Sequence, residues 1–466
     1  MVFSSLEFIF RFLPIFLFVY YIVPSRFRNV VLILGSLFFY AWGDHKYLIL
    51  IVLSVLVNHI LVLNMNMYQS ATSKKLWLIT ALFFNFGLLF FFKYINFVIE
   101  NINFLIRGNG GDGGIATLHM GLPLGISFYT FQAVSYVVDS YRGDIEKRPT
   151  LYRVATYLVM FPKLVSGPIA SYRDMESQLI RRRYSLEKFE SGLKLFVIGM
   201  GLKIIIANRI GILWNDIQTI GFESISTPLA WLGSLGYSLQ LYFDFYGYSL
   251  MAVGIGSMLG YQLPDNFNHP YMSKSVTEFW RRWHMTLGAW FKDYIYIPLG
   301  GNRCSDPRMI FNMLIVWLFT GLWHGANWNF ILWGLSLFFL IFIEKFFIKD
   351  FLDRSRVFCR LYMILYILFS WTLFAISNLS DVGTYFGRML GIVQGVNVNP
   401  NDFMKYFGQY KWLFLAGIFL CFPLGKRIYE KLQDSIICSI FLILVFWYSI
   451  YMLSNGANNP FLYFQF

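Results

Sequence analysis

Apolar runs of about 20 residues alternate with short polar segments along most of the chain. A helix of that length crosses a hydrocarbon core about 30 Å thick. The pattern therefore predicts an all-α, polytopic integral membrane protein. We expect spanning segments near residues 5–23, 29–42, 47–66, 76–105, 122–140, 151–170, 192–213, 228–260, 309–343, 358–378, 405–423 and 436–453.

The apolar segment 309–343 contains no charged residue and is too long for one perpendicular crossing. As a single helix it would extend for about 50 Å, well beyond the thickness of a bilayer core. We therefore expect it to tilt, to break, or to form two helices. The residues that favour a break are Gly321, Gly325 and Asn327, all close to His324.

Three other stretches have the character of connecting segments. Residues 107–121 are rich in glycine, which predicts a flexible loop. The strongly charged stretch 178–190 predicts a surface helix on the cytoplasmic side, and the mixed stretch 263–284 is the longest segment not expected to span. Since no internal repeat or soluble domain is evident, we expect a single membrane domain over residues 1–466.

Composition supports a lipid environment and argues against nucleic acid as a partner. Hydrophobic residues make up 57% of the chain and charged residues 14%, whereas soluble domains carry about 25% charged residues. The net charge of +13 comes largely from short loops such as "PSRFRN" and "GKRIYEK" that flank apolar runs, as in cytoplasmic loops. Membrane lipids are therefore the expected neighbours, and no basic, aromatic-lined groove for nucleic acid is indicated.

The N-terminal stretch predicts a first spanning helix rather than a cleaved signal peptide. It lacks both a basic n-region and a small-residue cleavage site. Arg26 and Arg28 follow the apolar run, and positive charges favour the cytoplasmic side. We therefore expect the N-terminus to lie outside the cytoplasm.

Metal and nucleotide chemistry find no support in the sequence. The cysteines form no C-x-x-C pair, and the six histidines show no metal-ligand spacing. A phosphate-binding G-x-x-x-x-G-K-[ST] loop is also absent from the sequence. We expect no metal, no bound cofactor, and ordinary unpaired thiols at Cys304, Cys359, Cys421 and Cys438.

His324 is the first candidate for chemistry, because it lies within the apolar stretch "TGLWHGANWNFILWG". A polar side chain at such a position is costly unless it faces a cavity or a partner, so it marks a functional hypothesis. The alternative is an imidazole that bonds to a neighbouring helix. Trp323 and Asn327 flank it as supporting candidates, and Gly321 and Gly325 form a G-x-x-x-G that permits close approach of a second helix.

The segment 278–303 is the second candidate, since it combines a histidine with concentrated charge. The alternative is a basic interfacial helix that contacts lipid phosphates. Arg281 and Arg282 lie close to His284 along the chain. Helical spacing places the following residues on one face: Thr277, Trp280, Arg281, His284 and Gly288.

Asp244 is the third candidate, in the otherwise apolar run 240–261. A carboxylate there needs a partner or a wet cavity. A buried ion pair or a helix-packing hydrogen bond would account for it equally well.

Several longer motifs resemble the membrane-bound O-acyltransferase (MBOAT) superfamily, in particular its bacterial branch of alginate and peptidoglycan O-acetyltransferase membrane subunits. The resemblance extends over nearly the whole chain. It is carried by "PLGISFYTFQAVSYVVDSYRG", "FPKLVSGPIASYRDM", "LYFDFYGYSLMAVGIG", "LPDNFNHPYMSKSVTEFWRRWHMTLGAWFKDYIYIPLGGNR", "LWHGANWNFILWG" and "NPFLYFQF".

This resemblance implies about eleven transmembrane helices and some re-entrant segments around a central tunnel. His324 matches the family's invariant histidine and His284 its second, more cytoplasmic one. The implied donor is cytoplasmic acetyl-CoA, used as a substrate. The implied acceptors are an extracytoplasmic partner of the SGNH-hydrolase type and then an envelope polysaccharide, which places the chain in a bacterial cytoplasmic (inner) membrane.

The chemistry of acyl transfer suggests roles for the candidates. His324 would act as general base on the acceptor hydroxyl, with an acetyl-imidazole as a less favoured variant. His284 would orient the thioester or polarise its carbonyl, and Arg281 or Arg282 would attract the phosphates of coenzyme A. Asp244 would support the tunnel by bonding to one of these groups.

Two other functions remain open from the sequence. A sister branch of the superfamily transfers D-alanine to teichoic acid from a carrier-protein thioester, with the same pair of histidines. A transporter or flippase would also place polar residues within the membrane. The lack of an internal repeat and the scarcity of intramembrane carboxylates disfavour the transporter.

Overall fold

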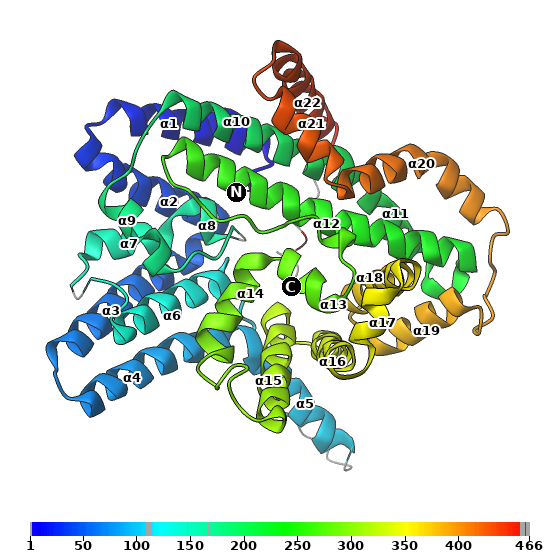
Figure 1. Cartoon of the computed structure of the whole chain (residues 1–466), viewed down its shortest axis with the longest axis horizontal. Coiled ribbons are helices and arrows are strands. Elements are labelled where there is room, and N and C mark those ends of the chain that lie inside the picture. The colour runs from blue at the N-terminus through cyan, green and yellow to red at the C-terminus, as the bar shows by residue number, and fades with distance from the viewer. Residues whose placement is uncertain (1, 109–113, 147, 166, 457–461, 463–466) are drawn as a thin grey trace. The chain divides into compact units, whose positions relative to one another are not determined.

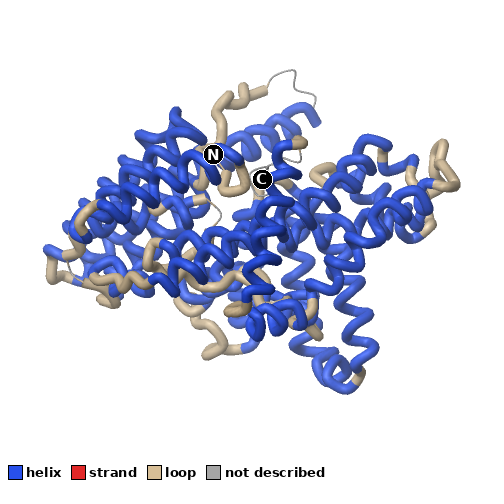
Figure 2. The backbone as a smooth tube through the Cα atoms, turned by 90° about the horizontal axis from the view of Figure 1, so that it is seen from above, coloured by secondary structure: helices blue, strands red, loops and turns tan. Residues whose placement is uncertain are grey.

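A computed structural model describes the chain except for residues 1, 109–113, 147, 166, 457–461 and 463–466. In the described part every regular element is a helix (Figures 1 and 2), as the sequence predicted. The helices form two compact units: residues 1–190 with 255–264, and residues 191–254 with 265–466. The expectation of one domain over residues 1–466 stays a prediction.

The first unit is built mainly from the N-terminal helices. Phe161 packs against the rings of Phe12, Phe16 and Phe39, which fixes the turn of chain that carries it between the helices. The helices are α1 (Leu13–Ile22), α2 (Arg28–Asp44), α3 (Leu48–Met67), α4 (Ala71–Leu89), α5 (Ile95–Gly108), α6 (Ile126–Arg142), α7 (Leu151–Val159), α8 (Phe161–Leu164) and α9 (Tyr172–Ile180). Two more begin in one unit and end in the other: α10 (Leu186–Gly201) and α12 (Thr227–Met258).

The predicted spanning segment 151–170 is not one helix. It divides at Met160 into α7 and the single turn α8, and residues 165 and 167–171 are not helical. Pro162 opens that turn, because proline favours the first turn of a helix but interrupts a helix interior. At Gly167 a Cβ atom would lie 2.2 Å from the carbonyl oxygen of Pro162, so the chain doubles back too tightly for any larger residue.

The charged stretch 178–190 is also not a continuous surface helix. Residues 181–185 are not helical and separate α9 from α10. Arg182 bonds to the side chain of Asn29, and its guanidinium lies 4.3 Å from the ring centre of Tyr261. These contacts hold the segment in an extended form in place of the helix that its composition favours.

The second unit contains the predicted site. Its helices are α11 (Asn208–Ile220), α13 (Val276–Arg282), α14 (Met285–Phe291), α15 (Asp306–His324), α16 (Trp328–Ile343), α17 (Lys349–Arg354), α18 (Arg356–Ala375), α19 (Leu379–Leu390), α20 (Asp402–Cys421), α21 (Leu424–Leu432) and α22 (Ile436–Ser454). The four cysteines are free thiols, and three of them are buried.

The predicted break in segment 309–343 is confirmed. Helix α15 ends at His324 and α16 begins at Trp328. The two helices fold back on each other at Gly321, where a Cβ atom would lie 2.3 Å from the carbonyl oxygen of Phe330 and 3.3 Å from Gly334. The glycines therefore permit a tight hairpin with His324 at its tip.

Several helices are long and apolar enough to cross a membrane. The described residues contain six such helices, or seven if the bent pair α20 and α21 counts as one span, with an angle of 74° between its parts. Large apolar side chains on these helices are exposed, among them Phe83 (80%) and Trp412 (72%), which suits contact with lipid. The expected count of about eleven, with a central tunnel, stays a prediction.

Candidate active site

His324 lies at the C-terminal end of α15, enclosed by aromatic rings. Its imidazole is 4% exposed. The ring centres of Trp323 and Trp333 lie 5.0 Å from it and that of Phe374 lies 5.2 Å away, each at a steep angle. This apolar enclosure shields the imidazole from bulk water.

His284 lies between α13 and α14, at a break that the sequence did not indicate. Its backbone is left-handed, with φ of 43°, so the predicted continuous helical face is wrong at this residue. A non-glycine residue in that conformation stores strain, which is typical of functional positions. The imidazole is 1% exposed and packs edge-on against Phe245, with 4.7 Å between ring centres.

Trp323 lies beside both histidines. Its ring centre is 6.0 Å from that of His284 and 5.0 Å from that of His324. The structure therefore brings the two predicted histidines into one site, with a single indole in contact with both.

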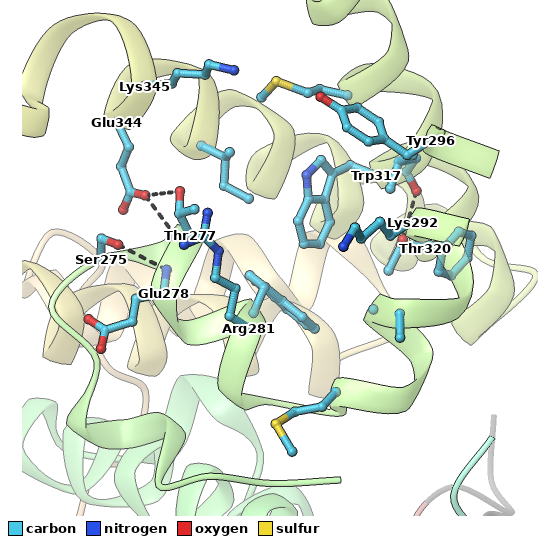
Figure 3. Close-up of a pocket in the computed structure, with 18 of the residues that line it drawn as sticks. Ser275, Thr277, Glu278, Arg281, Lys292, Tyr296, Trp317, Thr320, Glu344 and Lys345 are labelled. Atoms are coloured by element: carbon cyan, nitrogen blue, oxygen red, sulfur yellow. Dashed lines mark hydrogen bonds between the residues drawn. The ribbon is translucent and has the colours of Figure 1, made fainter. Parts of the chain in front are cut away.

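His284 lines a cavity of about 730 Å³. Figure 3 shows other residues of its lining. Trp317 and Thr320 of α15 lie on one side of it, opposite Arg281 and Thr277 of α13. His324, one helical turn beyond Thr320, does not line it. All five residues predicted to share a face do line this cavity, although the helix that was expected to carry them is broken: Thr277, Trp280, Arg281, His284 and Gly288.

The cavity is basic, because its four cations outnumber its three carboxylates. Its cations are Arg281, Lys292, Lys345 and Lys349, and its carboxylates are Glu278, Glu344 and Asp353. Glu278 forms an ion pair of 2.7 Å with Arg282. Glu344 is hydrogen-bonded to neutral groups of α13 and keeps its negative charge.

Glu344 is a site residue that sequence reasoning missed. It follows α16 directly and is 3% exposed. Its carboxylate accepts hydrogen bonds from the backbone N–H groups of Val276 and Thr277 and from the Thr277 hydroxyl, at 2.5, 2.8 and 2.6 Å. A carboxylate at the end of an apolar run was the available signal, but its partners lie far away in the sequence.

Asn266 is a second residue that the sequence did not single out. Its side-chain oxygen lies 3.2 Å from Nδ1 of His284 and accepts the Thr286 hydroxyl at 2.6 Å. Burial lowers the pKa of the His284 imidazole to about 3, so this histidine is neutral at physiological pH. Asn266 therefore contacts Nδ1, one of the two ring nitrogens whose protonation defines the tautomer of His284.

The remaining predicted residues lie outside the cavity. Arg282 pairs with Glu278. Asp244 forms an ion pair with Lys203 and accepts the backbone N–H of Leu462 at 2.9 Å, so the expectation that it bonds to Arg281, Arg282 or a histidine is wrong. The low-dielectric interior selects a buried cation as its partner, which is the structural alternative considered from the sequence.

In the described part of the chain, Asn327 forms no hydrogen bond with either histidine. It is half-buried and precedes the first turn of α16, without a side-chain capping bond. Asn329 is instead fully buried, and its amide donates to the carbonyl oxygens of Leu373 and Phe374. This bond ties α16 to the helix that carries Phe374 of the His324 enclosure.

The chain belongs to the MBOAT, membrane-bound O-acyltransferase, family. The family model matches residues 140–380, a range that contains both histidines and the cavity. Together with its apolar helices, this makes the protein a multi-pass membrane acyltransferase.

Its relatives carry related descriptions. The chain is 34% identical over 502 residues to a "probable alginate O-acetylase" of Azotobacter vinelandii, across 100% of both chains. It is 38% identical over 370 residues to a peptidoglycan O-acetyltransferase of Helicobacter pylori, covering 72% of this chain and 68% of that protein. A teichoic acid D-alanyltransferase of Bacillus subtilis is 31% identical over 238 residues, covering 48% of this chain and 60% of the relative.

Proposed function

We propose that the protein transfers acetyl groups from cytoplasmic acetyl-CoA towards a hydroxyl on the outer side of a bacterial inner membrane. The immediate acceptor would be an extracytoplasmic partner of the SGNH-hydrolase type, and the final one an envelope polysaccharide such as peptidoglycan or alginate. The observation that carries the proposal is the basic cavity with His284 in its wall.

The charge of the cavity suits coenzyme A as the carrier of the acyl group. Arg281, Lys292, Lys345 and Lys349 offer four cations, and the donor carries several phosphate charges. The volume of about 730 Å³ lies in the range of sites for extended small molecules. A phosphate end among the lysines would leave the thioester free to reach the His284 side.

The orientation in the membrane follows from the basic loops. Arg26 and Arg28 follow α1, and their positive charge supports a cytoplasmic position for this loop. An N-terminus outside the cytoplasm would then require the apolar stretch Phe8–Ile22 to cross the membrane. We extend this topology to the proposal, with the donor entering from the cytoplasmic side.

His324 is the proposed general base for the acceptor hydroxyl. The proton moves from the hydroxyl to the imidazole while the hydroxyl oxygen attacks the thioester carbon. The carbon–sulfur bond then breaks, and the thiolate of coenzyme A receives the proton. Trp323, Trp333 and Phe374 enclose this imidazole in apolar surroundings, which supports the role.

Acetyl transfer is favoured over D-alanyl transfer by the extent of the similarity. The match to the D-alanyltransferase covers 48% of this chain, whereas the match to the Azotobacter alginate relative covers all of it. A carrier-protein donor would also dock its protein surface outside the cavity and would need fewer cations within it.

The test uses the purified full chain in proteoliposomes with radiolabelled acetyl-CoA and a soluble SGNH-type partner. We expect release of free coenzyme A, acetylation of the partner, and no reaction with an alanyl carrier protein. His324→Gln should abolish acetylation while the protein keeps its thermal stability. Normal acetylation by this variant would refute the base assignment, and a wild-type protein without acetyl-CoA turnover would refute the function.

A further inference from the structure

Asn266 lies beside His284 although the two residues come from different segments. Its side-chain oxygen is 3.2 Å from His284 Nδ1, and its backbone oxygen accepts the N–H of Met285 at 2.9 Å. On the other side of the histidine, Asn268 donates its backbone N–H to the carbonyl of Arg282 at 2.9 Å. The strained turn at His284 is therefore clamped by the segment that carries Asn266.

The atom that faces the imidazole is the amide oxygen. The hydroxyl of Thr286 donates to it at 2.6 Å and the backbone N–H of Thr286 at 3.4 Å. A backbone N–H can only donate, so an NH₂ group in this place would oppose it. The orientation of the amide is thus determined by its neighbours.

We propose that Asn266 is a positioning residue that holds His284 in the tautomer with its proton on Nδ1. An oxygen that accepts hydrogen bonds requires an N–H at Nδ1. In a neutral imidazole the other nitrogen, Nε2, then has no proton and acts as an acceptor. Within the described chain Nε2 has no hydrogen-bond partner, and His284 lines the basic cavity.

This inference rests on the proposed function and changes the role expected for His284. A neutral imidazole with an unprotonated Nε2 cannot polarise a thioester carbonyl by donating a hydrogen bond. It accepts one from an O–H or N–H group of the molecule in the cavity. His284 therefore orients its substrate as an acceptor, and Asn266 makes that the stable arrangement.

The kinetic test compares variants in proteoliposomes at pH 8 with acetyl-CoA as the donor. Asn266→Ala frees the tautomer, and we expect kcat to fall roughly 10- to 100-fold with KM changed by less than about threefold. Asn266→Asp keeps an oxygen acceptor for Nδ1 and should recover most of the activity. Asn268→Ala is the matched control, because it removes an exposed amide from the same segment while the backbone bond to Arg282 remains, and it should stay within about threefold of wild type.

A spectroscopic test does not depend on turnover. Solid-state NMR of the ¹⁵N-histidine-labelled protein, with the His284 signals assigned by difference from His284→Gln, reports directly which nitrogen carries the proton. We expect an unprotonated Nε2 in the wild type and a mixed population in Asn266→Ala. A protonated Nε2 in the wild type, or equal losses of kcat in Asn266→Ala and Asn268→Ala, would overturn the inference even if acetyl-CoA turnover is confirmed. If the wild type turns over no acetyl-CoA but Nε2 is unprotonated, the proposed function fails and the tautomer assignment stands.

Discussion

Glu344 and Thr277 are bonded through two separate groups: the carboxylate accepts the backbone N–H of Thr277 at 2.8 Å and its hydroxyl at 2.6 Å. The carboxylate stands at the N-terminus of α13, where the first amide groups have no partner within the helix. A negative charge in this position also complements the helix dipole. The end of α16 therefore holds the helix that carries Arg281 into the cavity.

Replacement of Glu344 should affect both stability and donor binding. Glu344→Ala leaves the N–H groups of the buried Val276 and the partly buried Thr277 without this acceptor, and we expect a loss of about 1–3 kcal/mol in the free energy of unfolding. Because α13 then loses its anchor, the KM for acetyl-CoA should rise. Thermal unfolding and steady-state kinetics measure the two effects, and Glu430→Ala, at an exposed position of α21, is the control.

The lysines of the cavity should act mainly on donor affinity. Lys292→Gln combined with Lys349→Gln removes two of its four cations, and we expect the KM for acetyl-CoA to rise about fivefold at low salt. The effect should shrink as ionic strength increases, since screening already weakens these charges. Lys431→Gln on α21 removes a charge outside the cavity and should leave KM unchanged.

The sequence predicted the parts of the site that depend on local signals. An imidazole in an apolar run, an overlong apolar segment and helical spacing were enough to indicate His324, the break beside it and the residues that share the cavity with His284. The contributions of Asn266 and Glu344 were not predictable, because each depends on partners brought together only by folding. Asp244 illustrates the same limit, since its charge indicated a partner but not that the partner would be Lys203.

Trp323 should limit access of water to the acyl group, because its indole lies beside both histidines. Trp323→Ala removes a buried side chain that is 4% exposed, and we expect it to destabilise the protein by about 3–5 kcal/mol. In the folded fraction, hydrolysis of acetyl-CoA without an acceptor should increase relative to transfer. Trp412→Ala on α20, where the indole is 72% exposed, should change neither ratio nor stability. An unchanged ratio of hydrolysis to transfer in Trp323→Ala would contradict the shielding role.

The pH dependence should differ between wild type and Asn266→Asp. Burial lowers the pKa of His284 to about 3, so the wild-type imidazole remains an acceptor as pH falls from 8 to 5.5. Arg281 and Lys292 line the same cavity and also oppose a positive charge there, while Glu344 is bonded to α13. In the variant a carboxylate beside Nδ1 favours the imidazolium and raises the pKa of His284.

In Asn266→Asp, the acceptor nitrogen Nε2 of His284 is therefore protonated at a higher pH than in the wild type. The variant's kcat at saturating acetyl-CoA should begin to fall at a pH above that of the wild type. Asn268→Asp should follow the wild-type profile, because its added charge lies at an exposed position. Superimposed profiles for wild type and Asn266→Asp would show that the titration of His284 does not influence the reaction.

The ion pair of Lys203 and Asp244 should make a large difference to stability when only one partner is removed. The two side chains are 1% and 4% exposed, and Asp244 also accepts the backbone N–H of Leu462. Asp244→Leu removes this carboxylate from beside a buried cation, which costs about 3–5 kcal/mol. The double variant Lys203→Met with Asp244→Leu removes both charges and should recover much of that loss, since apolar side chains avoid the desolvation cost.

Thermal unfolding in detergent measures both variants, and acetyl transfer by the double variant should remain near wild type because neither residue lines the cavity. If the double variant is as unstable as Asp244→Leu, the bond to Leu462 rather than the charge pairing holds this part of the fold.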